Sequence, residues 1–143
     1  MGSRTTSELL QLPVQLHGIR LGRAVDVLLD AGGWRVLGFV VLCGDEAERF
    51  LPFAAAEAGD GEIAVVSALM LLDDVAFYSS RSESLRALLG GEVESGGRPA
   101  GRLRDLVVRR DGTVLDLVVE RDDRECRLQP RGASVLPQRV SAA

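Results

Sequence analysis

The sequence reads GRAVDVLL at residues 22–29 and GRLRDLVV at residues 101–108. Two more blocks recur in the same order: VLGFVV at 36–41 returns as VLDLVV at 114–119, and RFLP at 49–52 returns as RLQP at 127–130. The copies are 79 residues apart in the first block and 78 in the other two. A repeat that extends over three separate blocks predicts two copies of one small fold.

The repeat divides the 143-residue chain into a first copy at 14–72, a linker at 73–82 and a second copy at 83–137. Each copy has roughly 60 residues, a size at which a separate hydrophobic core is marginal. We therefore expect the copies to pack against each other or against a second chain, as in a homodimer. The first dozen residues are expected to trail or cap the first copy, and those after about Pro137 to be unstructured.

Short apolar strands separated by glycine turns predict an all-β fold. The strand segments 22–30 and 36–42 flank a glycine pair at 32–33, and an Asp-Gly turn at 111–112 takes its place in the second copy. No segment shows a long 3.6-residue period. The pattern is typical of small β-barrels, so we expect two tandem barrels packed with pseudo-twofold symmetry.

The second copy resembles the PRC-barrel family, which is named for the cytoplasmic domain of the photosynthetic reaction centre H subunit. The resemblance lies in LGGEV at 89–93, in PAGRLRDLVV at 99–108 and in the Asp-Gly turn that follows. The first copy is similar, with RFLPF at 49–53 where family members carry an aromatic-Leu-Pro-Phe strand. The family also includes the C-terminal domain of a ribosome maturation factor. The resemblance implies two PRC-like barrels that serve as docking surfaces for other proteins.

The sequence contains few residues that could perform catalysis or bind a metal. His17 is the only histidine, and no recognisable nucleophile motif accompanies it. One histidine and two distant cysteines, Cys43 and Cys126, do not match the ligand spacing of a zinc site. The acidic pairs at 73–74 and 122–123 are adjacent residues whose side chains diverge, so they do not predict a shared metal ion. We therefore predict no catalytic residue, no metal, no cofactor and no enzyme activity.

All 17 basic residues are arginine, and their distribution is uneven. Residues 1–80 hold five arginines against eleven acids, whereas residues 84–143 hold eleven against nine. The basic half contains no aromatic residue, so it lacks the stacking platform of an RNA-binding surface. Within it, Arg98, Arg109 and Arg110 flank turns and are expected in solvent. They either dock carboxylates or phosphates of a partner through bidentate contacts or only keep the surface soluble.

Strand alternation predicts which residues face each barrel interior. The inward set is Leu37, Phe39, Val41, Leu115, Leu117 and Val119. The opposite face of each copy then carries an exposed apolar stripe, a feature that usually marks an interface. The stripes consist of Leu28, Val36, Val40 and Leu42 in the first copy and Val107, Val114 and Val118 in the second. We expect the stripes to be buried between the barrels or in a dimer interface.

These observations favour a non-enzymatic adaptor or scaffold that docks on another protein or assembly. The alternative is an RNA- or ribosome-associated factor that uses the arginines of the second barrel. The unpaired cysteines indicate a reducing compartment, and no apolar run is long enough to span a bilayer, so we expect a cytoplasmic protein. The absence of lysine indicates a GC-rich coding sequence and a bacterial source.

Overall fold

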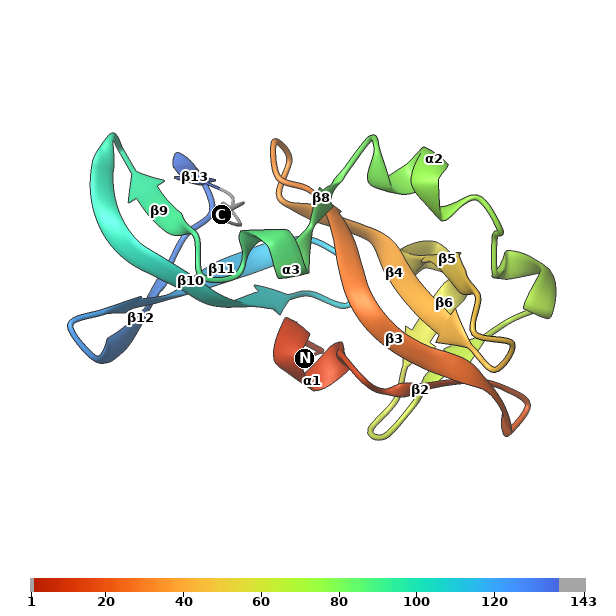
Figure 1. The fold of residues 1–143 in the computed structure, drawn as a ribbon. Coiled ribbons are helices and arrows are strands. Elements are labelled where there is room, and N and C mark those ends of the chain that lie inside the picture. The colour runs from red at the N-terminus through yellow and green to blue at the C-terminus, as the bar shows by residue number, and fades with distance from the viewer. Residues whose placement is uncertain (1, 137–143) are drawn as a thin grey trace.

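A computed structural model describes residues 2–136 and shows an all-β protein, as the sequence predicted (Figure 1). The strands form two sheets, one of which curls into a half-barrel. The end of the second repeat at Pro137 and the tail predicted after it lie outside the described residues. Between residues 2 and 136, no helix is long and apolar enough to cross a membrane.

The first sheet is formed mainly by the first repeat and has the strand order β5-β4-β3-β2-β7-β6, with β8 paired to β3. Its strands are β2 (Pro13–Leu16), β3 (Ile19–Asp30), β4 (Arg35–Cys43), β5 (Glu48–Pro52), β6 (Ala56–Ala58), β7 (Ile63–Val65) and β8 (Glu83–Ser84). Two 3-10 turns, η1 (Phe53–Ala55) and η2 (Ala68–Met70), connect parts of this half.

The second sheet has the order β12-β11-β10-β9-β13, with β1 paired to β10. Its strands are β1 (Arg4–Thr5), β9 (Glu92–Ser95), β10 (Arg98–Val108), β11 (Val114–Arg121), β12 (Arg124–Leu128) and β13 (Ala133–Val135). Three short helices complete the fold: α1 (Thr6–Leu9), α2 (Val75–Ser79) and α3 (Leu85–Leu88).

The leading segment of each repeat pairs with the sheet formed by the other repeat (Figure 1). In the second sheet Thr5 lies opposite Val107, and in the first sheet Ser84 lies opposite Leu28. The two pairings are counterparts, because the repeat spacing of 79 residues relates Thr5 to Ser84 and Leu28 to Val107. The expectation that the first dozen residues only cap the first copy is therefore wrong for β1 and α1, which contact the second sheet.

Each of these two leading segments, which we call the exchanged segments, is bound by a carboxylate of the sheet with which it pairs. Asp105 accepts hydrogen bonds from the Thr6 hydroxyl, from the Ser7 hydroxyl (2.6 Å) and from the Ser7 backbone N–H (3.1 Å). Asp26, its counterpart in the first repeat, accepts from the Ser84 hydroxyl and from the Arg86 N–H (3.2 Å). Hydrogen bonds to an ionised acceptor are stronger than neutral ones, so these two carboxylates hold the exchanged segments in place.

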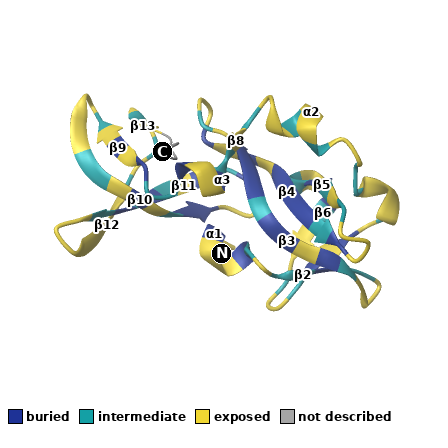
Figure 2. Cartoon of the chain, in the orientation of Figure 1, coloured by how far each residue is buried: buried dark blue, intermediate teal, exposed yellow. Residues whose placement is uncertain are grey.

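The two repeats also meet where β4 and β11 begin. Arg35 and Thr113 form an antiparallel bridge, the Val36 N–H donates to Gly112 O (2.8 Å), and the Val114 N–H donates to Trp34 O (2.9 Å). Each of these two hydrogen bonds is the counterpart of the other in the repeat. One continuous core surrounds this junction and includes residues of both repeats (Figure 2). The halves therefore share a core instead of each enclosing its own.

The predicted faces of β4 and β11 are wrong near their first residues. Leu37 and Leu115, expected inside, are 39% and 37% exposed. Val36 and Val114, placed on the opposite face, are buried in the shared core at the place where the two repeats meet. The cause is a β-bulge in each strand: Leu28 pairs with Gly38 but Leu29 pairs with Val36, which leaves Leu37 unpaired. Leu115 is left unpaired in the same way in the second sheet, because Val107 pairs with Asp116 and Val108 pairs with Val114. An extra residue reverses the alternation of side chains.

The remaining stripe residues of the first repeat are covered by Leu72 and by the linker that follows it, not by the second repeat. Leu28 and Val40 form a separate cluster with Val25 and Phe50, and Leu42 packs against it. This cluster is covered by Leu72, Val75 and Tyr78, and the Tyr78 ring stacks on Phe50 with 4.2 Å between centroids. In the second repeat Val107 is buried where β1 pairs with β10, and Val118 is half-buried.

We predict that Asp105→Ala lowers the free energy of unfolding by about 2–4 kcal/mol, because it leaves the buried Thr6 hydroxyl without its charged acceptor. Urea unfolding followed by circular dichroism measures the change. Asp116→Ala is the matched control, since the Asp116 side chain accepts no hydrogen bond from any of the described residues 2–136. Equal loss of stability in both variants would show that the exchanged segment does not depend on Asp105.

A second prediction compares equivalent valines on the outer faces of the two repeats. Val40→Asp places a charge beneath the linker and should cost about 2–4 kcal/mol, whereas Val118→Asp stays partly in water beside Arg127 and should cost less than about 1 kcal/mol. Thermal melts of the two variants test this. Similar losses would mean that the linker does not cover the first stripe in solution.

Candidate functional site: a pocket between the repeats

A cavity of about 530 Å³ lies between the two repeats, and we call it the junction pocket. Its lining residues are Gly2, Arg4, Leu9, Phe39, residues 53–60, Val66 and residues 108–110. They come from the N-terminal segment, from the first repeat and from the end of β10. Pockets that bind ligands commonly have volumes of roughly 300–1,000 Å³ and occur where two structural units meet.

The floor of the junction pocket is apolar and belongs to the shared core. Leu9, Phe39 and Val108 are buried members of that core. The Phe53 ring packs on Phe39 with 5.8 Å between centroids and also lines the pocket. Because these side chains are packed from behind, the floor is preformed.

The rim of the junction pocket carries three arginines and two acids. Arg4 lies 3.6 Å from Asp60, and Arg110 lies 3.5 Å from Glu57. Both ion pairs are long, and both acids are exposed to solvent, so each pair contributes little stability and can exchange for another anion. Arg109 forms no ion pair with any residue between 2 and 136. The rim therefore holds at least one guanidinium that is available to a ligand.

The turn after β10 positions the rim arginines. The Arg109 N–H donates to Thr113 O (2.8 Å), and the Gly112 N–H donates to Arg109 O (3.0 Å). Asp111 accepts from the Thr113 N–H (2.9 Å). Hydrogen bonds from Thr113, with the charges of Arg109 and Arg35 nearby, hold the pKa of the Asp111 carboxyl below its usual range. The turn is thus closed by an ionised carboxylate and directs two adjacent arginines to the pocket.

The structure separates the three arginines that the sequence analysis grouped. Arg109 and Arg110 both line the junction pocket, whereas Arg98 is exposed at the other end of β10, roughly 35 Å away along the strand. Arg4 also lines the pocket, although no feature of the sequence predicted it there. Its position depends on the exchanged pairing of β1 with Val108, and no local sequence signal indicates that pairing.

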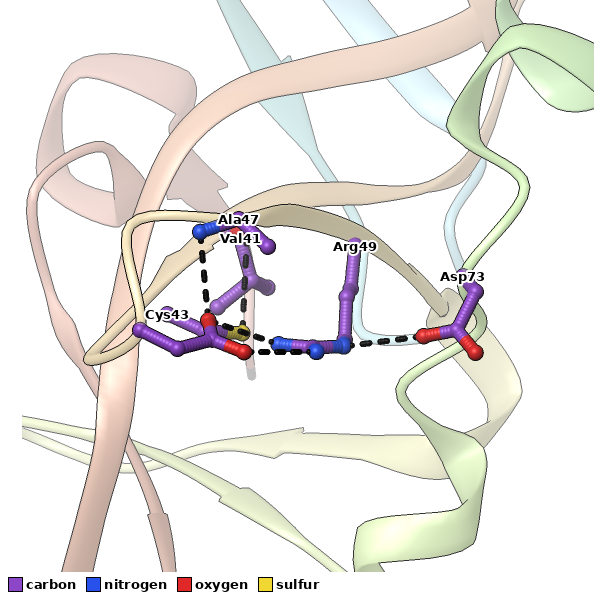
Figure 3. Close-up of polar contacts among 6 residues, drawn as sticks. Val41, Cys43, Ala47, Arg49 and Asp73 are labelled. Atoms are coloured by element: carbon purple, nitrogen blue, oxygen red, sulfur yellow. Dashed lines mark hydrogen bonds and ion pairs between the residues drawn. The ribbon is translucent and has the colours of Figure 1, made fainter.

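A second polar cluster anchors the linker to the first sheet (Figure 3). Arg49 donates two hydrogen bonds to Asp45 (3.0 and 2.8 Å) and a third from Nε to Asp73 (3.0 Å). The Arg49 guanidinium, assisted by the Ala47 N–H, lowers the pKa of Asp45 to about 2. The same contacts raise the pKa of Arg49. These three hydrogen bonds of Arg49 hold the start of the linker against the first sheet.

The other residues that the sequence offered as possible catalytic or metal-binding groups lie in turns or cap a helix. His17 has a positive φ of 51° in the exposed turn between β2 and β3. Asp74 caps α2 by accepting the Phe77 N–H (3.1 Å), and Asp122 with Asp123 forms the two-residue turn between β11 and β12. No group of three histidine, cysteine or acidic side chains between residues 2 and 136 could hold a metal ion. The two cysteines are free, Cys43 buried and Cys126 exposed.

Comparison with known proteins does not identify a relative. No protein-family model matches the chain, and no curated protein matches its sequence. The fold and the site together define a small all-β protein with an arginine-rimmed pocket between two repeats.

We predict that the Asp45 carboxyl titrates near pH 2 and that Arg49→Gln moves its pKa up toward the usual 3.8. Because the folded pKa is the lower one, ionised Asp45 stabilises the folded chain above about pH 4, and this contribution disappears as the pH falls toward 2. Side-chain carbonyl NMR measures the titration. An unchanged midpoint in the variant would show that Arg49 does not bind Asp45 in solution.

Proposed function

We propose that this protein is a non-enzymatic adaptor that docks on another protein through the junction pocket. One observation carries the proposal: Arg109, which has no ion-pair partner between residues 2 and 136, stands beside a preformed apolar floor. An apolar surface next to an available guanidinium binds a group that has both an apolar part and an anionic part. Protein segments with acidic and apolar side chains provide both.

We further propose that the two repeats are PRC-like barrels of a cytoplasmic, bacterial protein. The support comes from the residues: the repeated strand and turn pattern, and the Asp-Gly turn that follows GRLRDLVV. Gly22 and Gly101 add to it, because each leaves no room for a side chain against the facing backbone oxygen of the next strand. By the resemblance, such barrels serve as docking surfaces, which agrees with the adaptor function.

The RNA-binding alternative receives less support from the side chains of β10. Arg104 donates two hydrogen bonds to Glu120 (3.2 and 2.9 Å), and Arg102 donates to Gly90 O (2.9 Å). These arginines are engaged within the chain and do not form a continuous cationic surface with Arg98 and Arg109. An RNA backbone requires such a surface.

The test of the adaptor function is co-purification of partners from nuclease-treated lysate of the source cells. The double variant Arg109→Glu with Arg110→Glu should retain at least about tenfold less of any specific partner, because it places like charge against an anionic ligand. Arg98→Glu is the control, since it reverses one arginine charge outside the pocket and should bind as the parent does.

Circular dichroism establishes that all variants are folded. Partners that bind the double variant and the parent equally would contradict docking at the junction pocket. Partners that disappear from the parent after nuclease treatment would favour the RNA-associated alternative instead.

A further inference from the structure

We propose that the junction pocket binds an extended acidic segment of the partner protein, which adds as a new strand to the free edge of β6. The proposal rests on the adaptor function and names the chemistry of the partner.

β6 is the last strand of the first sheet and has only β7 as a neighbour. Residues 53–60 line the pocket without interruption. Successive side chains of a strand point to opposite faces, so a pocket that faced one side of the strand would contact every second residue. All three residues of β6 line the pocket, which indicates that the backbone edge of the strand borders it.

The hydrogen bonds of the β6–β7 hairpin identify the free backbone groups. The Gly59 N–H donates to Glu62 O (2.8 Å), and pairs of facing residues alternate between bonded and non-bonded along an antiparallel ladder. Glu57 opposite Ala64 is therefore the next bonded pair, and Ala58 opposite Ile63 is a non-bonded pair. The N–H and C=O of Ala58 consequently point away from β7, toward the pocket, where an added strand can bind them.

The side chains of this edge permit the close approach of another backbone. Ala54, Ala55, Ala56, Ala58 and Gly59 leave the edge without bulk. Exposed edges are usually protected by charged residues, proline or a covering segment. In the first sheet the opposite edge is covered, because Phe50 of β5 forms an antiparallel bridge to Leu72, the residue before the linker. In the second sheet one of the two edge strands, β12, carries Arg124, Glu125 and Arg127. Glu57 is the only charged residue of β6, and its carboxylate forms an ion pair with Arg110.

The pocket also determines which side chains the added strand should carry. A strand presents alternate side chains to two faces, about 7 Å apart on each face. Here one side offers the apolar surface of Phe53 and Val108, and the rim offers Arg4, Arg109 and Arg110. A segment that alternates apolar and acidic residues satisfies both, with its carboxylates on the arginines and its backbone on Ala58. This mode of recognition takes affinity from main-chain hydrogen bonds and specificity from alternate side chains.

The experiment uses the whole chain and a fluorescently labelled octapeptide of alternating glutamate and valine. We expect saturable binding with a dissociation constant below about 1 mM, and at least about tenfold weaker binding to Arg109→Glu. Glu57→Gln should tighten binding about two- to fivefold, because it frees Arg110 from its competing carboxylate. Arg98→Glu serves as the unaffected control.

Backbone pairing is tested with two peptide isomers that differ only in the position of their N-methyl groups. One isomer carries them on every valine and the other on every glutamate, so each blocks one edge of the strand and keeps the charge. We expect one isomer to lose binding while the other retains it. Equal affinities of the two isomers, whether strong or weak, would overturn strand addition.

A protein-side variant gives an independent measurement. Ala58→Pro removes the outward N–H and should abolish binding of the peptide, whereas Ala58→Ser keeps the N–H and should bind it as the parent does. Co-purification that depends on Arg109, combined with equal affinities of the isomers, would overturn strand addition and leave the adaptor function standing. Co-purification that does not depend on Arg109 would overturn docking at the junction pocket, and with it both proposals for this site.

Discussion

The structure depends on two carboxylates that each hold a segment from the other repeat. Asp105 binds Thr6 and Ser7, and Asp26 binds Ser84 and the Arg86 N–H. A repeat of roughly 60 residues buries so little surface that a separate core would be marginal. The exchange places α1 on β10 and α3 on β3, so that neither repeat completes its hydrophobic contacts without the other. Charge-assisted hydrogen bonds at the start of each helix thereby couple the two repeats into one folding unit.

The two sides of the junction are not identical, and the difference accompanies the pocket. Trp34 stands in the first repeat where Gly112 stands in the second, and both have positive φ (49° and 94°). The Trp34 side chain is buried and donates to Ala133 O (3.4 Å) across the junction. Gly112 offers no side chain, and the Phe53 ring lies against it instead. One side of the junction is filled by an indole, while the other has the Phe53 ring and the cavity.

The charged residues on the two sides of the junction differ in the same way. Arg4 and Arg109, which line the pocket, correspond in the repeat to Glu83 and Asp30 on the filled side. An approximately symmetric scaffold therefore presents a cationic, open junction on one side and an acidic, filled junction on the other. Repetition of the backbone provides the shape of the site, and divergence of a few side chains provides its charge and its volume.

The sequence by itself determined the strand content, the turns and the existence of two related halves, because alternation, glycine turns and repeat spacing are local properties. It did not predict the bulges at Leu37 and Leu115, which reverse the faces of both strands. It also aligned RFLP with RLQP at a spacing of 78, whereas Leu51 opposite Phe39 and Leu128 opposite Leu117 are 77 apart, since the second hairpin has a shorter turn. Only the tertiary structure decided that Arg4 joins Arg109 and that the linker covers Val40. Both arrangements bring together residues that are distant in the chain. They arise from the exchange of segments and from the packing of the linker on the first sheet.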